Sequence, residues 1–378
     1  MACKKKIRSL IEGTDGNFQL LCNCVSEEIN EIKVEDAYQL TEDNTTELIR
    51  TDLLRIKYPL FQSNVPAEFP HIVNGTPRIP HIIHQIGDST KISDNFLEGM
   101  RSFVKQNPTW VYRFWTYDSG YRFLKKYHPY LVDIYHNFGE KDVKKADLLR
   151  YAVIYTYGGI YADLDVKNLR SLNITTTKYA CIIPTEPFEH AGIIYRENFI
   201  LSSSVLLCRP NHPFFEMLLK YLQLANPRGH PVATTGPVYL TRIYMKYNNL
   251  SYQDVSMSVL NDSRSNSPYF YKGTIDEESD EGIYIPNSQY FGDKVEPDRI
   301  NKKGDLKDCA KELLVNAPVL KQRACKEFES RKVLRKDKTF TFTLHYWFHL
   351  WSQGKETLDF MQRYDITEVI PNAVLFQG

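Results

Sequence analysis

The stretch KKADLLRYAVIYTYGGIYADLDV, residues 144–166, indicates both the fold and the chemistry of this chain. Its first half has apolar residues at helical spacing, while Lys144 and Asp147 stay polar, which predicts an amphipathic helix. Gly158 and Gly159 predict the end of that helix, because glycine adopts a left-handed conformation without steric cost.

Residues 160–166 are predicted to form a strand, because they are rich in β-branched and aromatic side chains. Side chains alternate faces along a strand, so Asp163 and Asp165 are expected to point the same way at its end. Two such carboxylates suit a hard divalent cation, Mn²⁺ or Mg²⁺, which would hold a diphosphate.

Asp147 and Arg150 add to this signal, since they lie three residues apart on one face of the predicted helix. The Gly-Gly turn folds the helix back beside the aspartates, so two acids and an arginine are expected to converge at one mouth. We expect the Asp147–Arg150 ion pair to be exposed. The competing interpretation, ordinary surface charges throughout, is less favoured because all of them would have to be unrelated.

The surrounding residues alternate between strand and helix patterns. A buried strand is predicted at 77–86, a helix at 95–106, a strand at 110–115 and a helix at 120–127. This order is typical of an α/β domain with a mainly parallel sheet, in which ligands bind at the carboxyl ends of the strands.

The residues Asp147, Arg150, Tyr-Gly-Gly-Ile-Tyr at 157–161 and Asp163-Leu164-Asp165 resemble the core of the DXD sugar-transferase family. That family includes yeast initiating mannosyltransferases, inositol-phosphoceramide mannosyltransferases and animal α1,4-galactosyl- and N-acetylglucosaminyltransferases. The spacing is also similar to that of the large clostridial glucosylating toxins. The resemblance implies a nucleotide-diphosphosugar transferase (GT-A-like) fold, with a mainly parallel central sheet and flanking helices.

The resemblance also implies residues on the side of the sugar donor. His84 and Gln85 lie in a segment similar to the family's opening strand, which lies against the nucleotide, although His84 by itself is better explained as a core histidine. Gly87 stands where the family has an aromatic residue, which removes a stacking contact. Tyr161 is a further donor-side candidate.

The block HYWFHLWS, residues 345–352, resembles the family's closing H-x-W segment, which folds over the donor diphosphate. This implies His345 as a third metal ligand and Trp347 or Trp351 as the cover of the nucleotide or sugar. Without the resemblance, the same aromatic residues would be assigned to the core.

Acceptor-side candidates are fewer. Glu186 follows a predicted strand, and an exposed loop carboxylate is the competing interpretation. Thr235 and Gly236 belong to a segment that resembles the family's T-G-P loop, where a purely structural turn is equally favoured. Three serines, residues 202–204, stand where the family often has an asparagine.

The implied reaction moves a hexose from a nucleotide-diphosphosugar, a UDP-sugar or GDP-mannose, to a hydroxyl of a glycan or glycolipid, with retention of configuration. Asp163 and Asp165 would hold the catalytic metal, and Asp147 and Arg150 would grip the donor. Two other interpretations stay open. One is a non-catalytic carbohydrate- or nucleotide-binding homologue, and the other is a toxin-like protein glycosyltransferase.

The chain is expected to have a helical stem or cap at 1–70 and a catalytic domain at 71–370, with a surface insertion at 262–335. Residues 371–378 are predicted to be a tail, and their AVLFQG resembles the recognition sequence of a viral 3C protease. Among the cysteines, Cys181 and Cys208 are predicted to be buried thiols, and Cys309–Cys325 a disulfide if the compartment is oxidising.

A net charge of +1 gives no electrostatic reason to expect a nucleic-acid partner. No run of 18 apolar residues and no signal peptide is visible, which alone favours the cytoplasm. Five Asn-x-Ser/Thr sequons favour instead the lumen of the Golgi or secretory pathway, with membrane association only through an anchor absent from this chain; they lie at Asn44, Asn74, Asn173, Asn249 and Asn261.

Overall fold

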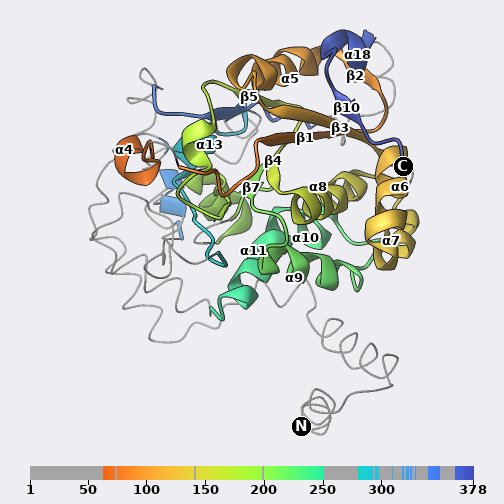
Figure 1. Cartoon of the computed structure of the whole chain (residues 1–378). Coiled ribbons are helices and arrows are strands. Elements are labelled where there is room, and N and C mark those ends of the chain that lie inside the picture. The colour runs from red at the N-terminus through yellow and green to blue at the C-terminus, as the bar shows by residue number, and fades with distance from the viewer. Residues whose placement is uncertain are drawn as a thin grey trace, which may run out of the picture. The chain divides into compact units, whose positions relative to one another are not determined.

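The computed structural model describes residues 63–250 (except 73–74, 140–141 and 198–199), 280–297 (except 293), 339–349 and 362–378, with isolated positions between 309 and 328 (Figure 1). These residues belong to one unit of the chain, 54–378. Most of the predicted stem and much of the predicted insertion lie outside the described residues, so these two assignments stay predictions.

A six-stranded mixed sheet forms the centre of this unit, in the order β10-β3-β1-β4-β7-β6. The first four strands are parallel, whereas β7 is antiparallel to β4 and β6 is antiparallel to β7. The α/β class with a mainly parallel sheet is therefore confirmed. The strands are β1 (Ile82–Gly87), β3 (Val111–Thr116), β4 (Gly159–Ala162), β6 (Cys181–Ile182), β7 (Val205–Cys208) and β10 (Val374–Leu375).

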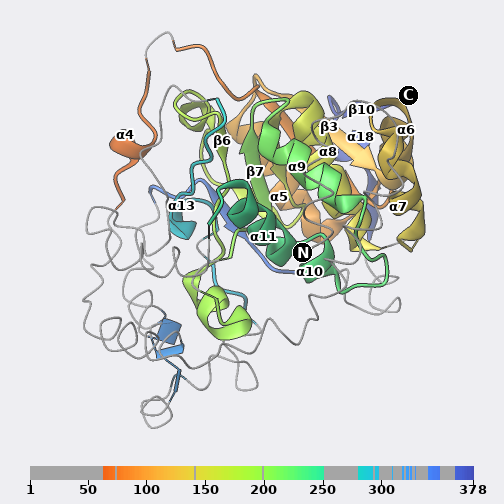
Figure 2. The same ribbon diagram turned by 90° about the horizontal axis from the view of Figure 1, so that it is seen from below.

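Helices cover both faces of this sheet (Figure 1). The helix α5 (Asp94–Gln106) and the short α18 (Ile366–Val369) lie on one face. On the other face, Figure 2 shows α8, α9 and α11 side by side, with α6 and α7 near the β3 edge. Their bounds are α6 (Tyr117–Tyr127), α7 (Val132–Asn137), α8 (Val143–Tyr157), α9 (Pro213–Leu222) and α11 (Pro237–Tyr247).

Neighbouring residues of one strand enter different cores, because side chains alternate across a sheet. Ile160 packs with the α5 face, and the next residue, Tyr161, packs with the α8 and α9 face. On β7, Leu207 packs with the α5 face and Leu206 with the α8 and α9 face. Each large apolar side chain buried in these layers contributes about 1.5–3 kcal/mol, so the two cores hold the sheet from both sides.

The turn after α8 has the predicted backbone. Gly158 has φ 63° and Gly159 has φ 101°, and a Cβ at Gly159 would lie 2.5 Å from the carbonyl oxygen of Ile82. Only glycine fits such a close approach at positive φ without strain. This glycine pair sends the chain from α8 directly into β4.

The predicted strand at 160–166 is wrong in its second half, because β4 ends at Ala162. The Asp163 amide donates to the carbonyl of Ser204, and the Val166 amide donates back to the carbonyl of Asp163 at 3.1 Å. These bonds close a turn between β4 and β5 (Val166–Asn168), and the turn contains Asp163 and Asp165. Their convergence therefore comes from a turn and not from strand alternation.

Two small antiparallel sheets bring the end of the chain to this region. β5 pairs with β8 (Thr343–His345) in a register that places Val166 opposite His345. β2 (Lys91–Ser93) pairs with β9 (Arg363–Asp365) just before α5. Residues far apart in the sequence thus become neighbours beside the central sheet.

The segment predicted as a tail supplies β10, the edge strand next to β3. Its Phe376 ring stacks on Trp115 with ring centroids 5.5 Å apart. Shorter helical segments complete the described part: α4 (Val65–Glu68), η1 (Pro129–Leu131), η2 (Asn173–Thr175), η3 (His190–Tyr195), α10 (Pro231–Thr234) and α13 (Ser288–Phe291).

Cys181 and Cys208 form a disulfide between β6 and β7, so the prediction of two buried thiols is wrong. The antiparallel register places the two residues directly opposite each other, which the sequence does not reveal. The predicted Cys309–Cys325 disulfide is present. In the part of the chain that is described, every helix is too short or too polar to cross a membrane.

Candidate functional site

A cavity of about 620 Å³ opens where β1 and β4 end, at the edge expected for a ligand site in an α/β sheet. Residues from distant parts of the chain line it. They include Gly87, Lys91, Ser93, Phe96, Tyr117, Asp147, Arg150, Tyr161, Asp163, Asp165, Glu186, Tyr195, Ser202, Ser203, Ser204, Gly236, His345, Trp347, Phe348, His349 and Arg363.

Asp163, Asp165 and His345 form a cluster in this cavity, with one potential ligand atom of each within 4.8 Å of the others. The β5–β8 register creates the cluster, and it brings His345 Nε2 to 3.1 Å from Asp165 Oδ1. Asp165 Oδ2 accepts a hydrogen bond from the Phe348 amide at 2.9 Å. The buried His345 Nδ1 has no hydrogen-bond partner among the described residues.

The three groups differ in how burial and charge act on them. Burial raises the pKa of Asp163, although the neighbouring Arg150 opposes that rise. Burial also acts to raise the pKa of Asp165, but the charge and hydrogen bond of His345 and the Phe348 amide outweigh it and lower the pKa. The pKa of His345 is raised, because the Asp165 charge and hydrogen bond outweigh its burial.

This donor set fits a divalent cation such as Mn²⁺. Carboxylates suit hard cations, and Mn²⁺ also accepts an imidazole ligand. A buried imidazole whose Nε2 lies 3.1 Å from an Asp165 oxygen, with Asp163 beside them, is the arrangement that a bound cation would complete. Ligation would require His345 to lose its proton at the ligating nitrogen.

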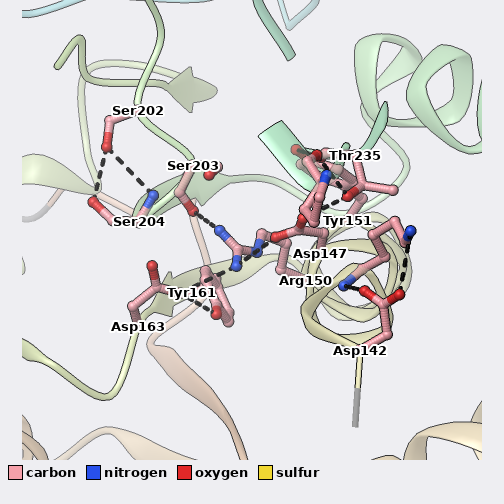
Figure 3. A network of polar contacts seen from close by, with 12 residues as sticks. Asp142, Asp147, Arg150, Tyr151, Tyr161, Asp163, Ser202, Ser203, Ser204 and Thr235 are labelled. Carbon is pink, nitrogen blue, oxygen red and sulfur yellow. Dashed lines mark hydrogen bonds and ion pairs between the residues drawn. The ribbon is translucent and has the colours of Figure 1, made fainter. Parts of the chain in front are cut away.

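Arg150 connects α8 to the aspartate turn (Figure 3). Its guanidinium donates to the Ser203 carbonyl at 2.6 Å, and lies 2.7 Å from Asp147 Oδ1 and 3.3 Å from Asp163 Oδ1. The side chains of Arg150 and Asp147 are only 5% and 6% exposed, so the expectation of an exposed ion pair is wrong. The sequence shows that Asp147 and Arg150 share one face of the helix, but it does not show that other segments bury this face.

Asp147 is held from its other side by the loop before α11. Thr235 Oγ1 donates to Asp147 Oδ2 at 2.5 Å, and the Tyr151 hydroxyl donates to the Thr235 carbonyl at 2.7 Å (Figure 3). Burial raises the pKa of Asp147, while Arg150 and the Thr235 hydrogen bond oppose the rise. The Thr235 hydroxyl is therefore committed to Asp147, and the neighbouring Gly236 lines the cavity.

Tyr161 joins the same network from β4. Its hydroxyl donates to Asp163 Oδ1, and its ring lies under the Arg150 guanidinium at 4.8 Å. Such a cation–π contact contributes about 0.5–2 kcal/mol, depending on desolvation. The structure thus brings the predicted residues Asp147, Arg150, Tyr161 and Asp163 together in one connected group.

His84 and Gln85 do not line the cavity, and both are fully buried. His84 accepts from Trp115 Nε1 at Nδ1 and meets the Gly158 carbonyl through Nε2, so both ring nitrogens are occupied. Gln85 donates to the backbone carbonyl of Asp163 and accepts from Tyr112. We therefore assign His84 and Gln85 to support of the site and not to contact with a donor.

The closing segment contributes Trp347 as well as His345. The two rings lie 3.9 Å apart, and Trp347 Nε1 donates to the Lys294 carbonyl at 2.7 Å. Trp347 has φ 60° and His349 has φ 48°, a left-handed conformation that costs such residues about 1–3 kcal/mol each. Trp351, the alternative predicted cover, lies outside the described residues.

Several lining residues escape sequence reasoning. Lys91 and Arg363 reach the cavity because β2 pairs with β9, a long-range contact with no local signal. Phe96 and Phe348 line the cavity with ring centroids 6.1 Å apart, although Gly87 lacks the family's aromatic side chain. Phe348 directly follows the predicted residue Trp347 in the sequence, and this adjacency is the signal that could have found it.

Residues 93–182 match the family described as the glycosyltransferase sugar-binding region containing a DXD motif. The matched range begins just before α5 and contains α8 and the turn with Asp163 and Asp165. The predicted resemblance to the DXD class of sugar transferases is thus confirmed for this range.

Curated relatives agree with this class. Mannosyl phosphorylinositol ceramide synthase SUR1 of Saccharomyces cerevisiae is 30% identical over 174 residues, which is 45% of this chain and 42% of that protein. Inositol phosphoceramide mannosyltransferase 2 of Schizosaccharomyces pombe is 25% identical over 266 residues, 64% of this chain and 73% of that protein. The chain spans about half the length of most curated relatives it matches. The PaToxG glycosyltransferase structure aligns with a TM-score of 0.36 and 16% identity, over 54% of this chain and 80% of that chain.

Proposed function

We propose that this protein is a metal-dependent retaining glycosyltransferase. It moves a hexose from a nucleotide-diphosphosugar to a hydroxyl of a glycan or glycolipid acceptor. The observation that carries the proposal is the cluster of Asp163, Asp165 and His345, which lies in one cavity with the buried pair Asp147 and Arg150. Retention of configuration follows the family that the site resembles.

The chain's own residues bind and orient the donor. Asp163, Asp165 and His345 would hold Mn²⁺ or Mg²⁺, which supplies positive charge to the departing diphosphate. Asp147 and Arg150 form a rigid wall beside the donor sugar, because each is fixed by partners on other elements. Trp347 covers the metal cluster from the closing segment and limits the access of water.

The names of the relatives indicate the first substrates to test. The matched proteins are named as mannosyltransferases and synthases of inositol phosphoceramide glycolipids. GDP-mannose is therefore the first donor, followed by UDP-hexoses, and an inositol-bearing lipid is the first acceptor. We do not expect a nucleic-acid partner, because the net charge is only +1.

The test is a screen of nucleotide sugars for hydrolysis and transfer with Mn²⁺ present. One donor should be hydrolysed, and chelator should stop its turnover until Mn²⁺ is restored in excess. Undiminished turnover in chelator would contradict the proposed dependence on a metal ion. Donor binding with neither hydrolysis nor transfer would favour the non-catalytic carbohydrate- or nucleotide-binding alternative.

We propose the lumen of the Golgi or secretory pathway as the location. Two of the five sequon asparagines, Asn173 and Asn249, are exposed in the described residues. Expression through a secretory pathway should give a mass above 44.1 kDa that an N-glycan-removing enzyme lowers. An unshifted mass would favour the cytoplasmic alternative and keep the toxin-like interpretation open.

A further inference from the structure

We propose that His190 is a positioning residue that holds Glu186 as the hydrogen-bond acceptor for a hydroxyl of the acceptor substrate, a polyol ring such as a sugar or inositol. The inference rests on the proposed function, because it assigns the acceptor side of the same cavity. His190 begins η3 and is not among the residues lining the cavity.

Glu186 reaches the cavity from the sheet strand β6. Because β6 is antiparallel to β7 and β7 is antiparallel to β4, β6 runs in the same direction as β4. Residues that follow β6 and β4 therefore emerge at the same edge of the sheet. The ends of β6 and β4 are two strand spacings apart, about 10 Å. Glu186 and Asp163 line the same cavity beyond these ends.

The contacts of His190 determine which of its nitrogens carries the proton. The backbone amide of Glu296 donates to His190 Nε2 at 3.0 Å, so Nε2 must be the acceptor. Nδ1 is then the N–H, and it donates to Glu186 Oε2 at 3.1 Å. A backbone amide cannot reverse its role, so this tautomer is fixed by the fold.

This arrangement leaves one side of Glu186 for a ligand. Its Oε2 is occupied by His190, and no hydrogen bond from the described residues reaches Oε1. The side chain is 6% exposed and lines the cavity. A carboxylate oxygen at the wall of a cavity accepts hydrogen bonds, and a substrate hydroxyl supplies a donor.

His190 is also packed against the metal side of the cavity. Its ring meets Trp347 edge to face, with centroids 4.7 Å apart, and Trp347 lies on His345. His190 therefore packs beside the closing segment, while its Nδ1 hydrogen bond goes to Glu186. The serines 202–204 and Tyr195 line the cavity as well and add hydroxyls that suit a polyol.

The experiment compares two substitutions of His190 that keep different halves of the imidazole. His190→Asn places an amide N–H near the position of Nδ1, so it can still donate to Glu186. His190→Gln places its amide near the position of Nε2. It can therefore still accept a hydrogen bond from the Glu296 amide, but it cannot donate to Glu186. Donor hydrolysis by water and transfer to myo-inositol and to methyl α-mannoside are measured for each variant.

His190→Gln should lower kcat/KM for the polyol about 10- to 100-fold, as loss of a supporting hydrogen bond does at other sites, while donor KM and hydrolysis stay within about twofold. His190→Asn should remain within about threefold of the wild type. His128→Gln is the matched control, because His128 is buried, bonds Thr156 and does not line the cavity. It should leave the ratio of transfer to hydrolysis unchanged.

Equal transfer by His190→Gln and the wild type would overturn the inference, as would equal losses in hydrolysis and transfer. A wild type that hydrolyses the donor and transfers to neither polyol also overturns it, whereas a wild type without either activity contradicts the proposed function itself. If His190→Gln does not fold, Glu186→Gln tests the same contact, and it should show the same selective loss of transfer.

Discussion

Two histidine-containing segments, β1 with His84 and the closing segment with His345, show how differently the fold uses one residue type. The family resemblance places both histidines beside the donor, although His84 by itself is better explained as a core histidine. In the structure both are buried, yet His84 bonds Trp115 and Gly158 within the core, whereas His345 faces Asp165 in the cavity. Burial lowers the pKa of His84 to about 3, but the Asp165 charge raises that of His345. The ring's partner, more than its burial, decides its role.

The largest expected effect comes from breaking the closing segment's link to the aspartate turn. Asp165→Asn removes a charge from the metal cluster and weakens the contacts to His345 and the Phe348 amide. Transfer should fall by about 10²- to 10³-fold or more, as when other charge-stabilising groups of active sites are removed. Turnover with Mn²⁺ measures the effect, and near-normal transfer would show that this segment is as structural as β1.

Arg150→Lys tests the group that links α8 to the aspartate turn. Lysine keeps the charge but cannot reach Ser203, Asp147 and Asp163 together, because it lacks the planar fork. We expect about a 10- to 100-fold loss in kcat/KM. Because the pair is buried, the free energy of unfolding should also fall by roughly 1–3 kcal/mol.

Denaturant unfolding and steady-state kinetics measure these two effects separately. Arg113→Lys is the control, since Arg113 stacks on Tyr157 and does not line the cavity. The Arg113→Lys variant should keep the kcat/KM of the wild type, and any loss should be confined to its free energy of unfolding. A fully active Arg150→Lys variant would show that the α8 network is only a scaffold.

The same substitution at both histidines sharpens the comparison directly. His345→Asn should weaken Mn²⁺ binding roughly tenfold or more, while the stability of the metal-free protein changes less. His84→Asn should lower stability by about 1–3 kcal/mol, because Trp115 Nε1 and the Gly158 carbonyl lose buried partners. Mn²⁺ titration and urea unfolding of both variants provide the measurement. Equal losses of Mn²⁺ affinity and of stability in the two variants would contradict the different roles of His84 and His345.

The last comparison is the pH dependence of stability in chelator, where the effect per pH unit is small. The folded pKa of His84 is about 3, below the model-peptide value of 6.5, so its stabilisation is present above pH 6.5 and is lost as the pH falls toward 3. The folded pKa of His345 is raised, so its contribution is present below pH 6.5 and is lost as the pH rises through the folded pKa. Each group changes the free energy of unfolding by at most about 1.4 kcal/mol per pH unit.

Urea unfolding between pH 3 and 8 should therefore give opposite slopes when each histidine variant is subtracted from the wild type. Burial also lowers the pKa of His128 to about 4 and that of His212 to about 3. These two histidines change the free energy of unfolding equally in the wild type and in each variant. Subtraction removes their contribution. Slopes of the same sign would contradict the assigned roles.

The sequence predicted the helix over α8, its glycine stop and the α/β class, because these features depend on local spacing and backbone preference. It also predicted that Asp147, Arg150, Asp163 and Asp165 converge, and the structure brings them together. It misplaced the two aspartates on a strand, because β4 ends at Ala162 and a turn closed by the bond from the Val166 amide to the Asp163 carbonyl follows. Residues 163–166 contain no glycine or proline, so the local pattern does not mark this turn.

By itself, the sequence determined the acids and the arginine of the site, since their spacing on one helix and one turn is local. The tertiary structure decided which histidine joins them. His345 meets Asp165 through the pairing of β5 with β8, and His84 turns into the core with Trp115. The tertiary structure also buried the Asp147–Arg150 pair and paired Glu186 with His190. These outcomes depend on strand register and layer packing between distant segments, which local residue spacing does not encode.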